Sequence, residues 1–200
     1  MNPSAAPRLS APLLTGRACA YLLGFSVFLL FLKILMNATV AEDAYITFRV
    51  LDQFVNGNGL RWNADERVQA YTHPLWLLLH IPFYAIWRNV FFVTFAIFLL
   101  FTAAAVLLAI KTWKRPSLSC AVLFLLPLAF SNTFIDYSTS GLENSLLHAL
   151  FAWFGWVLFC AKRDTFWFWS SFVVALSLMT RLDTVIFYTP LGIYLLLIQF

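Results

Sequence analysis

Long apolar runs separated by short polar breaks make up most of this chain. A helix needs ~20 apolar residues to span the hydrocarbon core of a bilayer. Runs that approach this length predict about six membrane spans, at residues 18–36, 90–110, 118–130, 146–160, 166–179 and 185–200. The pattern therefore predicts an all-α fold, in which residues 1–200 form a single polytopic transmembrane helical bundle.

The segment between the first two runs, residues 37–89, has a different pattern. Apolar residues recur at helical spacing over residues 44–55 and polar residues occupy the opposite face, which predicts an amphipathic helix lying on the membrane with its apolar side down. Residues 74–87 are apolar but short, and they contain a histidine and a proline. Such a stretch is more typical of an interfacial helix than of a span.

Composition and charge extend this interpretation. With 62% hydrophobic and 11% charged residues, the chain has too little polar surface for a soluble domain, and nothing in it indicates a nucleic-acid partner. Basic residues collect in short cytoplasmic loops. Arg8 and Arg17 therefore predict an inside amino terminus in a multi-pass protein of the cytoplasmic (inner) membrane, and residues 37–89 then form an outer loop with the further spans in 90–200.

Acidic residues concentrate in this predicted outer loop, which contains five of the nine: Glu42, Asp43, Asp52, Asp65 and Glu66. Glu42 and Asp43 directly precede the amphipathic helix. Acids there can simply cap the helix and complement its dipole. Two adjacent carboxylates at a bilayer surface also suit general-base chemistry, and both interpretations stay open at this stage.

Four short motifs together resemble a known family. They are EDAYITFR at 42–49, YTHPLW at 71–76, TSGLE at 139–143 and TRLD at 180–183. Their order and spacing resemble bacterial polytopic glycosyltransferases of the GT-C superfamily, mannosyl- and arabinosyltransferase-like enzymes that use polyprenyl-phosphate-linked sugars. Relatives often have two aspartates where this chain has Glu42 and Asp43, and they are usually longer, so we expect the module to be incomplete at its C-terminus.

The resemblance implies transfer of a sugar from a polyprenyl-phosphate donor to a hydroxyl of a glycan, lipid or protein acceptor on the outer, periplasmic face. Asp43 or Glu42 would be the catalytic base, and which of them acts is left open. No cofactor or metal is expected, although a divalent cation is not excluded. We expect donor-phosphate contacts from Arg181, His73 and Arg49, and substrate contacts from Glu143, Asp183 and Tyr71.

Two other function classes stay open. The chain could be a noncatalytic membrane scaffold or a truncated remnant, held together by helix packing alone. It could also be a transporter or lipid-handling protein, which would need broken helices or polar residues near the bilayer midplane. An Arg181–Asp183 pair that only anchors a helix end is the structural alternative to phosphate binding.

Overall fold

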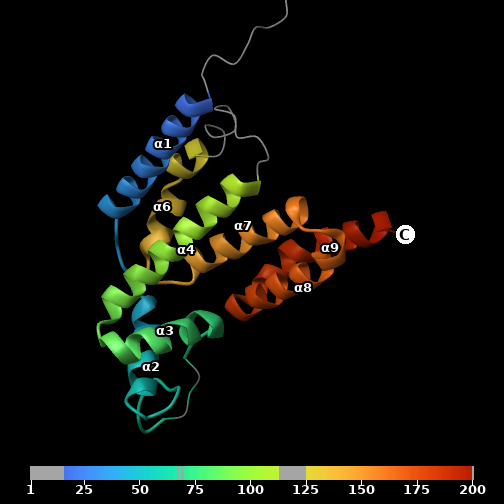
Figure 1. Cartoon of the computed structure of the whole chain (residues 1–200). Helices are drawn as coiled ribbons and strands as arrows, with labels where there is room; N and C mark the ends of the chain where they lie inside the picture. Colours follow the sequence, from blue (N-terminus) through green and yellow to red (C-terminus); the bar gives the residue numbers. More distant parts are fainter. Residues whose placement is uncertain (1–15, 67, 69, 113–124, 200) are drawn as a thin grey trace, which may run out of the picture.

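The computed structural model describes residues 16–66, 68, 70–112 and 125–199, and these residues form helices and loops with no strand (Figure 1). The helices are α1 (Gly16–Met36), α2 (Ala44–Val55), α3 (Pro74–Trp87), α4 (Val90–Thr112), α6 (Asn132–Thr139), α7 (Asn144–Cys160), α8 (Arg163–Thr180), the 3-10 helix η1 (Leu182–Thr184) and α9 (Val185–Gln199). The predicted all-α fold is confirmed.

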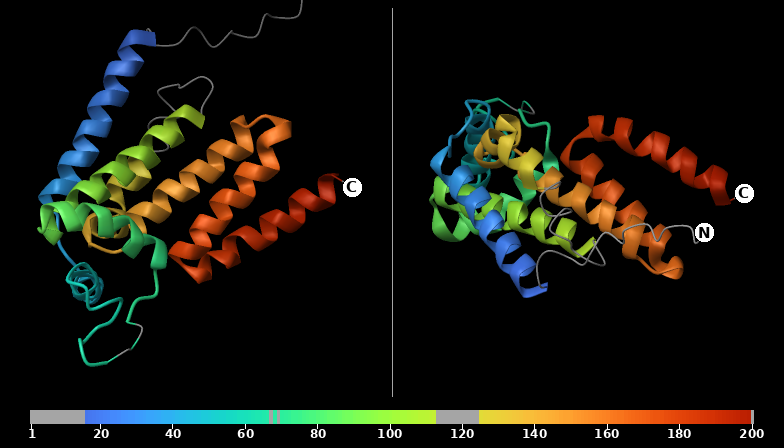
Figure 2. Two further views of the ribbon diagram at one scale, coloured as in Figure 1. Left: turned by 60° about the horizontal axis from the view of Figure 1, so that its bottom comes forward. Right: turned by 90° about the horizontal axis from the view of Figure 1, so that it is seen from above.

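The long helices α1, α4, α7, α8 and α9 run roughly side by side, and α2 and α3 lie at one end of them (Figures 1 and 2). α4 packs most extensively against α7, which in turn packs against α8. The largest buried cluster joins these helices to α3 and α9 through Trp76, Val93, Leu150 and Val173, among others. The loops after α1, α6 and α8 consequently meet at the end that carries α2 and α3.

Fewer helices than expected are long and apolar enough to cross a membrane. Of the described helices, only α4 meets both conditions alone, and its 23 residues extend about 34 Å against a hydrocarbon core of ~30 Å. α6 and α7 satisfy these two conditions only when they are taken together as one span, and the angle between them is 114°. The six predicted spans are thus corrected to one or two, because helices such as α7 and α9 have only 17 and 15 residues. The predicted span at 118–130 falls mostly outside the described residues.

The two helices predicted within residues 37–89 are confirmed at their predicted positions, 44–55 and 74–87. α2 ends where expected, because Asn56 caps it and Gly57 follows with a φ of 86°. Its apolar face does not lie open to lipid, however. Val50 and Leu51 pack against Leu77 and Tyr84 of α3, so protein covers the stripe that was expected to face the membrane.

The turn between α6 and α7 holds the start of α2 in place. Gly141 in this turn has a φ of 80°, which side-chain-bearing residues rarely adopt. A Cβ on Gly141 would come within 2.8 Å of the Ala44 Cβ. The backbone N–H of Ala41 donates to the Ser140 carbonyl at 2.8 Å. The segment that leads into α2 is therefore fixed against the turn before α7.

This close approach makes Gly141→Ala costly. We expect a loss of about 2 kcal/mol or more in unfolding free energy, because the left-handed backbone is strained and the added methyl group meets α2. Gly155→Ala is the matched control, since it lies inside α7 with no atom within 4 Å of its added Cβ. Thermal unfolding in detergent compares the two variants, and equal stability would contradict the packing described here.

Candidate functional site

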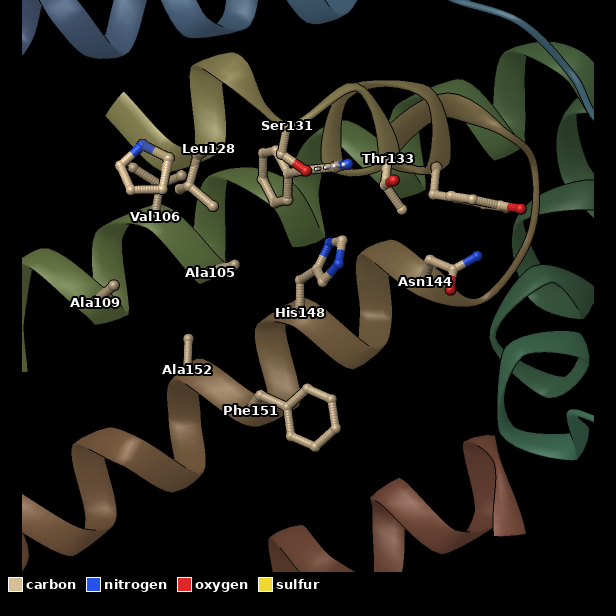
Figure 3. A pocket seen from close by; sticks show the side chains of 13 residues that line it. Ala105, Val106, Ala109, Leu128, Ser131, Thr133, Asn144, His148, Phe151 and Ala152 are labelled. Atoms are coloured by element: carbon tan, nitrogen blue, oxygen red, sulfur yellow. Dashed lines mark hydrogen bonds between the residues drawn. The ribbon is translucent and has the colours of Figure 1, made fainter. Parts of the chain in front are cut away.

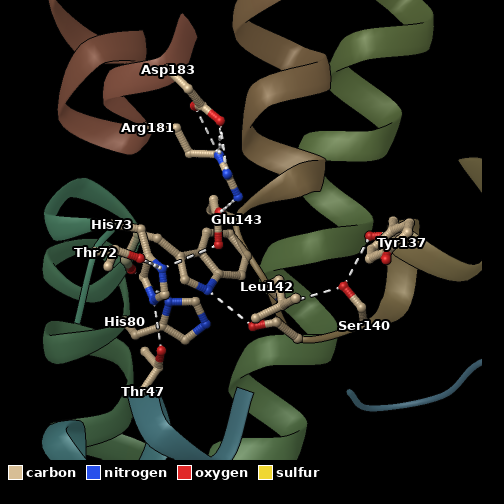
Figure 4. Close-up of polar contacts among 12 residues, drawn as sticks. Thr47, Thr72, His73, His80, Tyr137, Ser140, Leu142, Glu143, Arg181 and Asp183 are labelled. Carbon is tan, nitrogen blue, oxygen red and sulfur yellow. Dashed lines mark hydrogen bonds and ion pairs between the residues drawn. The ribbon is translucent and has the colours of Figure 1, made fainter. Parts of the chain in front are cut away.

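A chain of polar contacts crosses the end of the bundle where the loops meet (Figure 4). Thr47 Oγ1 lies 2.6 Å from His73 Nε2, and His73 Nδ1 lies 3.2 Å from Glu143 Oε2. The second Glu143 oxygen accepts a hydrogen bond from Arg181 Nη1 at 2.9 Å. Arg181 also donates from Nη2 to Asp183 Oδ2 at 2.8 Å. Four of the predicted site residues are thereby brought together.

Three members of this chain, His73, Glu143 and Arg181, are placed by the ends of helices. His73 caps the N-terminus of α3, where Pro74 occupies the first turn and needs no hydrogen-bond acceptor for its nitrogen. Glu143 holds the same position before α7, where the helix dipole favours an acid. Arg181 ends α8, and its carbonyl accepts hydrogen bonds from Thr184 that begin η1.

Glu143 is the buried centre of the chain. Its side chain is 4% exposed, whereas those of Arg181 and Asp183 are 46% and 55% exposed. A carboxylate taken out of water needs paired charge and hydrogen bonds on its oxygens. Glu143 has both, because Arg181 binds one oxygen and His73 the other.

His73 takes part as a neutral imidazole. Burial lowers its pKa most strongly, Glu143 raises it and Arg181 lowers it, and the net result lies below the ordinary histidine value. A neutral ring donates from one nitrogen and accepts at the other. Nδ1–H therefore donates to Glu143, and Nε2 accepts the Thr47 hydroxyl proton. The arrangement links α2 to α7 without placing a second positive charge in the site.

Arg181 keeps hydrogen-bonding capacity after these contacts. Asp183 raises its pKa first, and Glu143 adds to the same shift, so the guanidinium stays charged; in turn, Arg181 lowers the pKa of Asp183. Of its five N–H donors, Nε, one on Nη1 and one on Nη2 are used by the two carboxylates. One N–H on each terminal nitrogen remains, on a side chain that is nearly half exposed.

Glu42 and Asp43 lie exposed immediately before α2. Asp43 occupies the N-cap position of α2, yet its side chain makes no capping hydrogen bond. Within the described part of the chain, neither carboxylate has a polar side-chain partner. Asp43 precedes Thr47 by four residues and shares its helical face. The backbone of Asp43 is held beside the Gly141 turn through its neighbours Ala41 and Ala44.

The two remaining predicted site residues, Arg49 and Tyr71, make structural contacts around α2 and the loop that follows it. Arg49 donates to the Trp62 carbonyl at 2.9 Å and to Asn63 Oδ1 at 2.8 Å, and its guanidinium lies 4.8 Å from the centre of the Trp62 ring. These contacts fold the loop back onto α2. Tyr71 packs against the cluster of Val50 and Leu51. The structure shows no contact between Arg49 and the Thr47-to-Asp183 chain.

A second layer supports the polar chain from beneath. Trp76 is fully buried and donates from Nε1 to the Gly141 carbonyl at 3.1 Å. His80 stacks edge-on against Trp76 with ring centroids 4.4 Å apart, and its Nδ1–H donates to the Trp76 carbonyl at 2.8 Å. α3 therefore fixes the turn that carries Glu143.

Comparison with known proteins adds no assignment. No protein-family model matches this chain, and no curated protein and no solved structure matches it significantly. Among the described residues, no group of three or more His, Cys, Asp or Glu side chains could hold a metal ion. The resemblance to polyprenyl-phosphate-dependent transferases therefore stays a prediction, and the site has to be judged by its geometry.

Sequence reasoning missed Thr47, Trp76 and His80 as parts of this site. Thr47 could have been found, because it lies between apolar positions on the buried side of α2 and one turn after Asp43. Trp76 and His80 lie four residues apart, so they share one face of α3. Nothing in the sequence indicated that the Trp76 indole reaches the Gly141 carbonyl.

Glu143 should matter far more for stability than Asp183. We expect Glu143→Gln to lower the unfolding free energy by roughly 2–3 kcal/mol, because a buried partner of Arg181 and His73 loses its charge. Asp183→Asn is the control and should cost ~1 kcal/mol or less, since that pair faces solvent. Denaturation in detergent measures both values, and similar losses would contradict a buried Glu143.

His80 should make the protein sensitive to acid. The His80 pKa is lowered to about 4: burial is the largest cause, the bond to the Trp76 carbonyl opposes it, and His73 makes the smallest contribution to the lowering. The unfolded state, with the ordinary histidine pKa of 6.5, binds the proton more tightly than the folded state does. The stability that comes from a neutral His80 is therefore fully present above pH 6.5 and is lost as the pH falls toward 4.

The size of this acid effect is on the order of 3 kcal/mol. Apparent melting temperatures in detergent between pH 7 and pH 4 test it, and His80→Phe, which cannot be protonated, should show a shallower decline. A variant that declined as steeply as the wild type would assign the effect to other groups.

Proposed function

We propose that the chain is a membrane glycosyltransferase that moves a sugar from a polyprenyl-phosphate donor to an acceptor hydroxyl at the end of the bundle carrying α2 and α3. The observation behind this proposal is the convergence of three separate loops on one buried carboxylate. An exposed acid pair precedes α2, whose start is held against the turn before Glu143, and a half-exposed guanidinium binds Glu143 directly. The proposed step needs a base and a cation at those two places.

Asp43 is the proposed base. Its carboxylate is exposed and without a polar partner among the described residues, and it shares a helical face with Thr47. Glu42 is also exposed, and it lies one residue farther from Thr47. Glu143 cannot take this role, because both of its oxygens are engaged. Asp43 would accept the acceptor's hydroxyl proton as that oxygen bonds to the sugar's anomeric carbon.

Arg181 is the proposed contact for the leaving phosphate. As the bond between the anomeric carbon and the phosphate oxygen breaks, the phosphate keeps the electron pair and its negative charge grows. The two spare N–H groups of Arg181 would stabilise that charge, while Glu143 and Asp183 hold the guanidinium in place. His73 supports this arrangement through Glu143. No divalent cation enters the step, because Arg181 supplies the positive charge.

A membrane location follows from this proposal and from the surface. Large apolar side chains lie exposed along α1, α4 and α9, including Phe25, Phe28, Leu100, Phe187 and Leu197. Soluble monomers rarely expose large apolar patches, and exposed side chains of this size on three helices support a lipid-facing surface. We propose that lipid covers it in the cytoplasmic membrane, with the Glu143 end outside.

Asp43→Asn tests the proposed base. We expect the rate of transfer to fall by ~100-fold or more, because the amide cannot accept the proton. Asp136→Asn is the matched control, being an exposed acid before the same turn. The purified chain is incubated with a panel of polyprenyl-phosphate sugars, with and without a chelator, and release of polyprenyl phosphate is followed.

Three outcomes of that assay are informative. A loss in Asp43→Asn with turnover retained in Glu42→Gln and Asp136→Asn assigns the base to Asp43. A loss in Glu42→Gln alone assigns it to Glu42. Polyprenyl phosphate binding without turnover of any donor would favour a noncatalytic scaffold over an enzyme.

A further inference from the structure

A cavity of about 600 Å³ lies between α4, α6 and α7, apart from the Glu143–Arg181 pair (Figure 3). Its volume is within the range of small-molecule binding sites. α7 contributes Asn144, His148 and Ala152, which follow one another at intervals of four and share one face of the helix. The opposite face of α7 packs against α8 through residues such as Leu150. The cavity therefore lies on the side of α7 that faces away from α8.

The lining changes character from one end of the cavity to the other. Asn144 and Thr133 lie at one end, and Ala109, Leu128 and Ala152 lie at the other (Figure 3). About 12 Å of helix separates Asn144 from Ala152, at 1.5 Å per residue. A ligand that matched this lining would have a small polar group at one end and a hydrocarbon chain behind it.

No described residue that lines the cavity carries a formal charge, except through protonation of His148. An ionised head group would lose its hydration without gaining a counter-ion. The hydroxyl, amide and imidazole groups at the polar end can instead exchange hydrogen bonds with a neutral head. The charged phosphate of a sugar donor does not fit this lining.

His148 provides a second observation. Its Nδ1 is buried and has no hydrogen-bond partner among the described residues, while its ring packs against Phe134 with centroids 4.9 Å apart. The imidazole points from α7 into the space below α6 (Figure 3). Nδ1 itself has almost no accessible surface, so a ligand in the cavity would meet the exposed part of the ring and not this atom.

The polar end of the cavity adjoins the proposed site. Asn144 directly follows Glu143, and Tyr137 lines the cavity three residues before Ser140. The Ser140 carbonyl binds the N–H of Ala41, and Thr139 Oγ1 accepts from the N–H of Thr39 at 3.2 Å. The segment that leads to Asp43 is thus held beside this end of the cavity.

We propose that the cavity binds the chain of a neutral single-chain lipid alcohol, with its hydroxyl at the Asn144 end. A methylene group displaces roughly as much volume as a water molecule, ~30 Å³, so the cavity holds a chain of about 20 carbons. This is too small for two acyl chains. On the basis of the proposed function, the bound alcohol is the acceptor, and its hydroxyl loses the proton that Asp43 takes.

Photolabelling tests the binding directly. The full chain in detergent is labelled with a hexadecanol analogue that carries a diazirine in its chain. Ala152→Phe, which fills the apolar end, should reduce labelling by about tenfold or more. Ala103→Phe is the matched control, because Ala103 lies one turn before the exposed Leu107, away from the cavity. His148→Phe keeps a ring of similar size and should weaken labelling by hexadecanol but not by a hexadecane analogue.

Competition defines the head group. Unlabelled hexadecanol should displace the probe at concentrations at least ~10-fold lower than hexadecyl phosphate, because the described residues of the lining offer no cation. Equal competition by both, or by hexadecane, would show unspecific filling of an apolar space and overturn the inference. Unchanged labelling in a folded Ala152→Phe variant, checked by its melting temperature, would also overturn it.

The binding and the proposed transfer can fail separately. Asp43→Asn should keep hexadecanol labelling while losing transfer. Labelling without transfer to any alcohol would support the binding site and contradict the proposal that the bound alcohol is the acceptor. Transfer to other acceptors without hexadecanol labelling would overturn the inference about this cavity and leave the proposed function standing.

Discussion

The end of the bundle depends on keeping the Glu143 carboxylate charged and out of water. Desolvating an acid costs several kcal/mol, and it is tolerated only when both oxygens have good partners. Arg181 from the end of α8 and His73 from the start of α3 provide them. Removing Arg181 would leave a buried charge uncompensated, and removing His73 would leave one carboxylate oxygen without its hydrogen bond. This contact therefore specifies how three helix ends are arranged, whatever its net contribution to stability.

The same contact explains why the outer parts of the site can be exposed. Thr47 connects α2 to His73, and Gly141 lets α2 approach the turn before α7. Asp43 then needs no bond of its own to be positioned, because the backbone on both sides of it is held. Arg181 is similarly anchored through its carboxylate partners, and two of its N–H groups stay open. Rigid backbone beneath exposed polar atoms is what a preorganised site requires.

The sequence predicted the helices around residues 44–55 and 74–87 well, because hydrophobic periodicity and glycine positions act locally. Its prediction that α2 lies on lipid was wrong, since periodicity shows that a face is buried but not what covers it. His73, Glu143, Arg181 and Asp183 were chosen separately, from their helix-end positions and a family resemblance, and the structure brings them together. The contact of Trp76 with Gly141 joins residues 65 positions apart and has no local signal. The number of spans was overestimated because short apolar helices can pack into a bundle without each being long enough to cross a bilayer.

α7 organises these features because it presents a different chemistry in each direction. At its N-terminus, Glu143 fixes the ionic contacts; toward α8, Leu146, Leu150 and Phe154 form the core; and toward α6, Asn144, His148 and Ala152 line the cavity. Residues three and four apart share a face, so a single helix can keep charge, packing and cavity separate. This separation is why an anionic donor and a neutral chain would occupy different places around the same helix. The positive charge of Arg181 lies beyond the helix end, and no charged residue of the described chain lines the cavity side. On the functions proposed above, a lipid phosphate would therefore bind outside the cavity, beside Arg181, and a neutral alcohol within it.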